Sequence, residues 1–292
     1  MRAFETFIGD EHPDHPRPKC KPDPGDPGFW RIIDGEIVAK PLILLTNDDG
    51  IYAQGILAAW QELRKIGEVE VVAPDAERSA VGHAITLLLP LRTKEVVRRN
   101  VRFGYAVNGM PADCVKIAIK AILPRPPDLV VSGINLGSNT GTNVIYSGTV
   151  SAATEARILG IPSIAVSLAT FTHPDFTYAA KFTRKLALQV IARGLPDKTL
   201  LNVNIPNLPE EKIKGVAITR QGDSRVEERF EKRTDPRNQT YYWLDGTFKL
   251  QELEEHADAK MVNEGYVSIT PVSYDLTAYP AVDMLEHWNL QP

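Results

Sequence analysis

Two adjacent acidic residues, Asp48 and Asp49, stand where a strand is expected to end. An aliphatic run at residues 42–45 precedes them and gives way directly to polar residues, as a buried parallel strand does when it enters a loop. Open α/β sheets bind ligands outside the carboxyl ends of their strands, so the two acids occupy the usual position of an active site. Neighbouring carboxylates repel each other, and a bound cation relieves that repulsion. The same residues also suit a solvated turn, so the pair alone leaves both interpretations open.

Two further oxygen-bearing residues follow other expected strands. Ser79 lies in the polar loop after residues 69–73, and Asn135 lies in the loop after residues 128–132. Parallel strands end at one edge of the sheet, so we expect both residues to approach the two acids. Carboxylate, hydroxyl and amide oxygens form a hard ligand set that suits Mg²⁺, Mn²⁺ or Ca²⁺ rather than a structural zinc. Taken singly, Ser79 and Asn135 are more typical of residues that hydrogen-bond within their own loops.

The segment 141–151 carries glycine and hydroxyl residues into an expected helix. Ser147, Gly148 and Thr149 open that helix, and the free N–H groups of a helix N-terminus form a ready site for an anion such as phosphate. The segment lacks the Lys-Ser/Thr ending of a nucleoside-triphosphate loop, and no GxGxxG fingerprint of a dinucleotide site follows the first strand. The alternative is that Ser or Thr only caps the helix.

Alternating strands and helices must position these residues. Because β-α-β crossovers are almost always right-handed, their order predicts an α/β fold: a Rossmann-like, doubly wound, mostly parallel sheet covered on both faces. The expected strands are residues 42–45, 69–73, 128–132, 161–168 and 200–205, and the expected helices are residues 55–66, 110–123, 147–159 and 175–193. Strand-like runs at 84–89, 93–97 and 101–107 predict a β excursion within this series.

The chain divides into three parts. Residues 1–40 combine many prolines with charges, which predicts a flexible N-terminal arm. Residues 41–206 carry the Rossmann-like catalytic core, and residues 207–292 form a C-terminal extension. Within the extension we expect short strands at 216–219, 240–244 and 266–270 and a charged helix near 253–260.

Composition narrows the classes of function. With 43% hydrophobic and 24% charged residues, the 292-residue chain is an ordinary globular protein. Its net charge of -4 argues against a general electrostatic footprint for nucleic acid, so we expect no duplex nucleic acid partner. The 2 cysteines exclude a disulfide framework and a cysteine zinc site, which fits a cytoplasmic location. No window approaches the roughly 20 apolar residues that span a bilayer, and the first residues are unlike a signal peptide, so no membrane partner is expected.

Five motifs in order resemble those of the SurE family. They are TNDDGIYAQGI at 46–56, APDAERSAVGHAIT at 73–86, NGMPADCVK at 108–116, SGINLGSNTGTNVIYSGTVSAA at 132–153 and GYVSITP at 265–271. The motifs extend over most of residues 41–275 and leave the N-terminal arm outside.

The resemblance implies a metal-dependent 5′/3′-nucleotidase that hydrolyses nucleoside 5′- and 3′-monophosphates to nucleoside and inorganic phosphate. It implies one divalent ion per subunit, Mg²⁺ or Mn²⁺, and a C-terminal extension that exchanges between subunits of a homodimer or homotetramer. The residues that match the family's metal ligands are Asp48, Asp49, Ser79 and Asn135, and the two acids are the catalytic candidates. The residues assigned to the substrate phosphate are Asn135, Ser147, Gly148 and Thr149.

Metal-assisted hydrolysis is the mechanism that fits these residues: the ion polarises a phosphoryl oxygen and activates a water, while the helix N-terminus holds the transferring group. Spacing does not decide whether Asp48 or Asp49 also acts as a nucleophile or an acid, and an isolated His83 is either an acid–base group or structural. The strand end lacks the Asp-x-Asp of haloacid-dehalogenase phosphatases. Two rivals remain: a nucleotide-binding module without turnover, and a receiver-type switch, whose phospho-accepting Asp is missing from the stretch 130–133.

Overall fold

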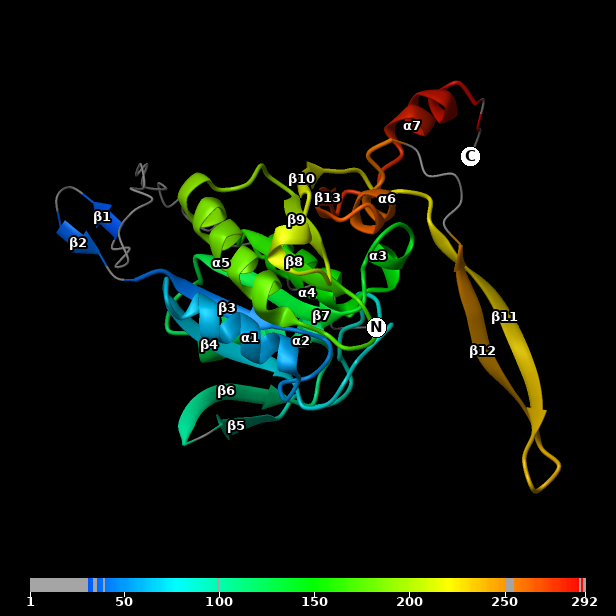
Figure 1. Cartoon of the computed structure of the whole chain (residues 1–292), viewed down its shortest axis with the longest axis horizontal. Helices are drawn as coiled ribbons and strands as arrows, with labels where there is room; N and C mark the ends of the chain where they lie inside the picture. Colours follow the sequence, from blue (N-terminus) through cyan, green and yellow to red (C-terminus); the bar gives the residue numbers. More distant parts are fainter. Residues whose placement is uncertain are drawn as a thin grey trace.

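A nine-stranded sheet organises the protein, with the strand order β10-β13-β9-β8-β7-β3-β4-β6-β5 (Figure 1). The computed structural model describes residues 31–33, 36–38, 40–98, 100–249, 255–288 and 290. The six adjacent strands β9, β8, β7, β3, β4 and β6 run parallel. At one side β5 lies antiparallel to β6, and at the other β13 lies antiparallel to β9 and parallel to β10. The strands of this sheet are β3 (Leu42–Thr46), β4 (Glu68–Pro74), β5 (Thr93–Arg98), β6 (Val101–Val107), β7 (Leu129–Leu136), β8 (Ser163–Ala169), β9 (Thr199–Pro206), β10 (Gly215–Ile218) and β13 (Tyr266–Ser273).

The order of the strands defines one topological switch point. From β3 the chain moves outward to β4 and β6, and it then returns to place β7 on the opposite side of β3. From β7 it continues outward to β8 and β9. A crevice therefore opens outside the carboxyl ends of β3 and β7, where doubly wound folds bind their ligands. The predicted Rossmann-like, mostly parallel sheet is confirmed.

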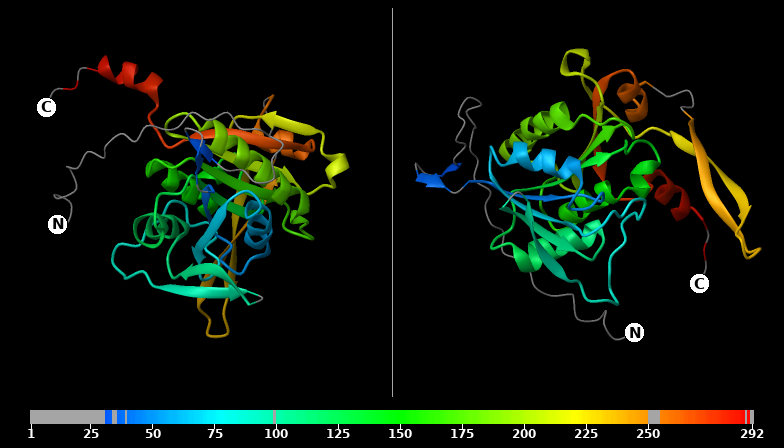
Figure 2. Two further views of the ribbon diagram at one scale, coloured as in Figure 1. Left: turned by 90° about the vertical axis from the view of Figure 1, so that its left-hand side faces the viewer. Right: turned by 60° about the horizontal axis from the view of Figure 1, so that its bottom comes forward.

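Helices cover both faces of the sheet. Helices α1 and α5 lie side by side on one face, and α2 and α4 pair on the other (Figure 1; Figure 2). The central strand β3 serves both layers, because Ile43 and Leu45 join the core under α1 and α5 while Leu44 joins the core under α2 and α4. The helices are α1 (Gln54–Leu63), α2 (Pro111–Ile117) with a π-helical continuation (Ala118–Ile122), α3 (Asn143–Tyr146), α4 (Gly148–Ile158), α5 (Phe176–Arg193), a 3-10 turn (Glu210–Lys212), α6 (Asp258–Asn263) and α7 (Tyr279–Glu286). No helix in the described part of the chain is both long and apolar enough to cross a bilayer.

The expected strand at residues 84–89 is wrong. This run lies in the loop between β4 and β5, and Leu88 within it is 95% exposed. Thr86 gives its backbone N–H and its hydroxyl to the Asp113 carboxylate at 2.9 and 2.6 Å. A buried side chain, rather than a strand partner, thus satisfies the backbone at this point. The expected strand at 128–132 is longer than predicted, because β7 continues to Leu136 with a register shift against β8 between Ser132 and Asn135.

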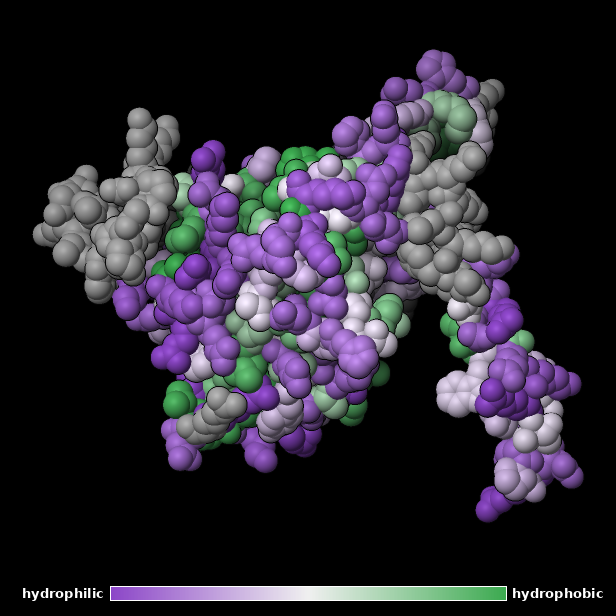
Figure 3. Space-filling model, viewed as in Figure 1, coloured by the Kyte–Doolittle hydropathy of each residue, from purple (hydrophilic) through white to green (hydrophobic). Residues whose placement is uncertain are grey.

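The segment after Pro206 divides between the sheet and a hairpin. Strands β10 and β13 extend the main sheet beyond β9, whereas β11 (Arg225–Thr234) and β12 (Thr240–Lys249) pair only with each other. The β11–β12 hairpin projects away from the sheet and its helices (Figure 1; Figure 2). On the face seen in Figure 3, hydrophilic residues predominate and hydrophobic ones are scattered between them.

The expected N-terminal arm falls mostly outside the described residues. Within it, β1 (Arg31–Ile33) pairs antiparallel with β2 (Glu36–Val38). Residues 1–30, 34, 35 and 39 are not described.

The contact between α1 and β7 leads to the first prediction. Gly55 in α1 has no room for a side chain, because a Cβ there would lie 1.9 Å from the carbonyl oxygen of Ile134 in β7. We expect Gly55→Ala to destabilise the protein by about 2 kcal/mol, since so short a contact with a backbone atom places the overpacking cost at the upper end of its range, about 3 kcal/mol, against a helix-propensity gain of about 1 kcal/mol. The melting temperature should fall by roughly 4–8 °C.

Gln61→Ala is the matched control, because Gln61 is exposed on the same helix. Its melting temperature should stay close to that of the wild type. An unchanged melting temperature in Gly55→Ala would show that α1 does not pack against β7 as closely as described.

Candidate active site

Asp48 is buried where the end of β3 meets the start of α4. Its carboxylate accepts a hydrogen bond from the Thr149 backbone N–H at 3.0 Å and another from the Thr149 hydroxyl. Gly148 lies against the same side chain, because a Cβ at this position would be 2.8 Å from Asp48 Cβ. The absence of a side chain at Gly148 therefore allows the helix N-terminus to approach the carboxylate this closely.

Asp49 faces the end of β7. Its Oδ2 accepts a hydrogen bond from the Leu136 backbone N–H at 3.1 Å. The preceding residue, Asn135, is half-buried and donates its side-chain N–H to the Gly137 carbonyl at 2.7 Å. Because the amide nitrogen takes that position, the Asn135 side-chain oxygen points the other way and is left to accept a different partner. The structure thus brings Asp49 and Asn135 to the same strand end, as the sequence predicts.

Burial disfavours the ionised form of both carboxyl groups and so raises their pKa values. Desolvation raises the pKa of Asp48 above its ordinary value, although the hydrogen bonds from Thr149 act in the opposite direction. Desolvation, together with the neighbouring Asp48 charge, raises the pKa of Asp49 to about 6. A group of positive charge beside them would favour the ionised forms. A bound cation would therefore relieve the electrostatic cost of burying this pair.

Ser79 lies on a loop that touches the site through its backbone. The Arg78 N–H donates to the Asp48 carbonyl at 2.7 Å, which places the residue before Ser79 against the β3 end. The Ser79 side chain is exposed and donates to Glu77 Oε1 at 2.6 Å. The structure brings the Ser79 segment to Asp48, but it shows no hydrogen bond between the Ser79 hydroxyl and the other three candidate ligands.

The residues present fit a hard divalent cation. Within the described part of the chain, no cluster of three or more His, Cys, Asp or Glu side chains is arranged to hold a metal. A cation at this edge would therefore have two carboxylates and would draw its other ligands from neutral oxygens such as those of Asn135 and Ser79. Mg²⁺ binds in this manner, through one or two carboxylates with water and substrate oxygens completing its shell.

The three residues of the Ser147-Gly148-Thr149 turn have different contacts. Ser147 caps α4, because its Oγ accepts the Val150 N–H at 3.1 Å. Gly148 packs on Asp48 and Thr149 hydrogen-bonds to it. The N-terminus of α4 thus holds the Asp48 carboxylate. Among the described residues, the Gly148 N–H has no hydrogen-bond partner.

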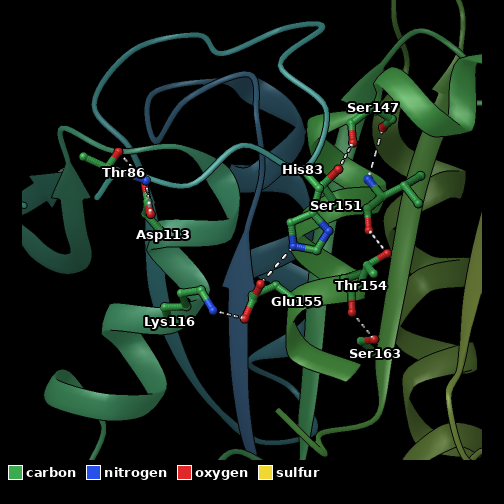
Figure 4. A network of polar contacts seen from close by, with 11 residues as sticks. His83, Thr86, Asp113, Lys116, Ser147, Ser151, Thr154, Glu155 and Ser163 are labelled. Carbon is green, nitrogen blue, oxygen red and sulfur yellow. Dashed lines mark hydrogen bonds and ion pairs between the residues drawn. The ribbon is translucent and has the colours of Figure 1, made fainter. Parts of the chain in front are cut away.

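A further buried carboxylate, which the sequence did not indicate, lies behind the turn. Glu155 on α4 binds His83 Nε2 at 2.9 Å and also pairs with Lys116 of α2 (Figure 4). Burial by itself would raise the pKa of Glu155, but the hydrogen bonds and charges of His83 and Lys116 outweigh it and hold the pKa below its ordinary value. His83 therefore ties the Ser79 loop to α4. No local pattern indicated it, because the partners His83 and Lys116 lie 72 and 39 positions from Glu155 along the chain.

Another missed residue, Asp258, fixes the loop that leads into α4. Its carboxylate is fully buried and accepts N–H groups from Gly141 at 2.9 Å and from Gly222 at 3.0 Å. Asn139 adds a contact from its N–H to Asn204 Oδ1 of β9 at 2.7 Å. The glycine-rich loop is thus held by side chains of the C-terminal segment, and no local sequence pattern indicates a partner 117 positions away.

Comparisons with known proteins agree with this geometry. A family model described as "Survival protein SurE" matches residues 43–228. The chain is 51% identical over 248 residues to a 5′-nucleotidase SurE of Syntrophobacter fumaroxidans, which covers 85% of this chain and 99% of the relative. It is 53% identical over 252 residues to a 5′-nucleotidase SurE of Chlorobium limicola, covering 86% and 98%. A crystal structure of the SurE protein from Aquifex aeolicus superposes with a TM-score of 0.75 at 44% identity, covering 85% of this chain and 99% of that chain. The chain therefore belongs to the SurE family, as the order of its motifs predicts.

Proposed function

We propose that this protein is a metal-dependent nucleotidase, which hydrolyses nucleoside 5′- and 3′-monophosphates to nucleoside and inorganic phosphate. One observation carries the proposal: two adjacent buried or half-buried acids, Asp48 and Asp49, lie with Asn135 at the switch point of a SurE-family sheet. Relatives that are about half identical over nearly their whole length carry the name 5′-nucleotidase.

Two groups of residues would have separate roles, in binding the metal ion and in binding the phosphate. Asp48, Asp49, Ser79 and Asn135 would hold one Mg²⁺ or Mn²⁺ ion per subunit, which supplies a polarised phosphoryl oxygen and an activated water when bound. Asp48 is oriented for this by two hydrogen bonds from Thr149. Asn135, the Gly148 N–H and the Ser147 hydroxyl lie on the same edge and would bind the substrate phosphate, as donors at a helix N-terminus do. The Thr149 hydroxyl donates to Asp48 and would act on the phosphate only through that carboxylate.

Release of inorganic phosphate from purine and pyrimidine 5′- and 3′-monophosphates, with and without a chelator, tests the proposal. Chelator-sensitive release supports it. Binding of nucleotides without release would favour a binding module, and transfer of phosphate onto the protein itself would favour a receiver-type switch. The latter is disfavoured by β7, which carries no Asp in Leu129–Leu136.

The charge of Asp49 leads to the second prediction. Asp49→Asn keeps the shape of the side chain and its acceptor for the Leu136 N–H, but it removes a charge that burial and Asp48 oppose. We expect the metal-free variant to melt at a temperature equal to the wild type or a few degrees higher, because roughly 1 kcal/mol of relieved repulsion shifts the midpoint by about 2–4 °C. Adding Mg²⁺ or Mn²⁺ should raise the melting temperature of the wild type only, and turnover should be lost in the variant.

Calorimetric or fluorescence melting with and without metal measures both effects. Asp283→Asn serves as a control, because Asp283 is exposed on α7. Metal stabilisation of Asp49→Asn equal to that of the wild type would remove Asp49 from the ligand set. Asp48→Asn should also lose metal stabilisation and turnover, but it should melt at a lower temperature, because both Asp48 oxygens accept hydrogen bonds from Thr149 and an amide nitrogen cannot accept one.

The hydroxyl of Thr149 leads to the third prediction. Thr149→Val preserves the shape of a fully buried side chain and deletes the hydrogen bond to Asp48. Because the bond orients a carboxylate at the site, we expect kcat to fall on the order of a hundredfold, comparable to the loss of one positioned donor. Thr154→Val is the matched control, since the Thr154 hydroxyl bonds only to the Val150 carbonyl of the same helix at 2.9 Å. Equal turnover in the two variants would reduce Thr149 to a residue that supports the helix.

The assembly that we propose is a homodimer or homotetramer in which the C-terminal extension contacts another copy. A two-stranded hairpin is at best marginally stable in water by itself. In the β11–β12 hairpin, Phe230 lies opposite Leu244, and these side chains are 68% and 56% exposed. We propose that contact with a second copy covers this pair.

Replacing the pair tests the assembly and is the fourth prediction. Phe230→Ser combined with Leu244→Ser should lower the molar mass measured by light scattering at micromolar concentration, because apolar contact area is lost. Lys232→Ser on the same strand should leave the mass unchanged. A double variant with the wild-type mass would place the interface elsewhere.

We also propose a cytoplasmic location, which suits the free buried thiol of Cys114.

A further inference from the structure

Phe171 is an exposed aromatic residue that the proposed mechanism does not use. It lies in the loop between β8 and α5, and 79% of its surface is exposed. The loop around it is closely held: the Thr170 hydroxyl donates to the Thr172 carbonyl at 2.7 Å and accepts the Thr172 N–H at 3.2 Å. A phenyl ring at the apex of a hydrogen-bonded turn loses little conformational freedom when it meets a ligand.

The far side of the same loop is fixed to β9. The Asn207 side chain, just after β9, donates to the His173 carbonyl at 3.1 Å and accepts the Asp175 N–H at 3.0 Å. Together with the Thr170 contacts, these bonds fix the loop on both sides of Phe171. An exposed apolar ring is thus presented by a preorganised segment rather than by an unrestrained one.

The ring rests on the strand end that carries the candidate site. A Cβ on Gly137 would lie 2.4 Å from Phe171 Cε1, so the ring reaches the backbone there and Gly137, with φ at 107°, must remain a glycine. The Gly137 carbonyl accepts the Asn135 side chain, and the N–H of the adjacent Leu136 donates to Asp49. Phe171 therefore lies against the residue that binds the Asn135 side chain, and that residue is next to the one that binds Asp49.

We propose that Phe171 is the platform on which the heterocyclic base of the substrate stacks. This inference rests on the proposed function and adds the base-binding part of the site. About six covalent bonds of ~1.5 Å join the phosphorus of a 5′-monophosphate to its base, so the base of a bound nucleotide reaches beyond the phosphate to neighbouring groups at the same strand end. Stacking on an aromatic ring is available to every base, because each has a π-face. The platform should therefore favour nucleotides over sugar phosphates while discriminating weakly among bases.

A pair of substrates that differ only in the base tests the inference. We expect the ratio of kcat/KM for adenosine 5′-monophosphate to that for ribose 5-phosphate to fall about 5- to 150-fold in Phe171→Ala, the range typical for loss of a stacking platform. The change should appear mainly in KM, because stacking acts on bound substrate and transition state alike. Phe171→Trp should restore the ratio. Leu88→Ala is the control, since Leu88 is an even more exposed apolar residue on another loop.

Binding of adenosine, which has no phosphate, separates this inference from the proposed function. Calorimetric titration should show weaker binding to Phe171→Ala than to the wild type, even if the wild type released no phosphate from any nucleotide and the nucleotidase proposal failed. An unchanged substrate ratio together with unchanged adenosine binding would overturn the platform. So would an unchanged ratio with a lower molar mass by light scattering, which would assign the ring to a contact between copies. Because the ring is largely exposed, melting temperature should confirm that Phe171→Ala is folded.

Discussion

The contact between the Asp48 carboxylate and the first turn of α4 is the constraint on which the site depends. A carboxylate with so little access to water is costly, and two hydrogen bonds from Thr149 at the positive end of a helix offset part of that cost. The contact requires β3 and the segment after β7 to be neighbours, which only the switch point of a doubly wound sheet provides. It also requires Gly148, because any side chain there would occupy the space of Asp48. The neighbouring charge on Asp49 leaves the pair electrostatically unbalanced, and a divalent cation is the simplest group that would balance it.

Three other buried acids, which do not touch Asp48, hold the loops around this contact. Thr86 is fixed by Asp113, His83 by Glu155, and Gly141 by Asp258. Each acceptor lies on a helix or at its start, and each reaches a segment that has no strand partner of its own. Loop backbone groups that are buried need such partners, since an unpaired N–H is expensive. This arrangement lets long glycine- and asparagine-rich segments keep one conformation at the ligand edge, where Phe171 is presented by a loop fixed in a similar way.

The C-terminal segment also extends the sheet and holds one of the loops at the site. Strands β10 and β13 complete the sheet beyond β9, and the start of α6 supplies Asp258 to the loop before α4. The hairpin β11–β12 leaves the sheet between these two contributions. The same C-terminal segment therefore both holds the loop before α4 and projects away from the sheet (Figure 1).

The amino-acid sequence by itself determined the layered fold and the chemical character of the site. Aliphatic runs and helical periodicity are local signals, and they placed β3, α1, α4 and α5 close to their observed bounds. The pairing of Asp48 with Asp49 is local as well, because adjacency in the chain makes their repulsion unavoidable. Local signals failed at residues 84–89, where a side-chain carboxylate from α2 replaced a strand partner. Only the tertiary structure decided that Thr149 contacts Asp48, that Glu155 holds His83, and that Phe171 lies on Gly137. These contacts join residues 34 to 101 positions apart along the chain, so they are set by strand order and helix packing, and no spacing within one segment encodes them.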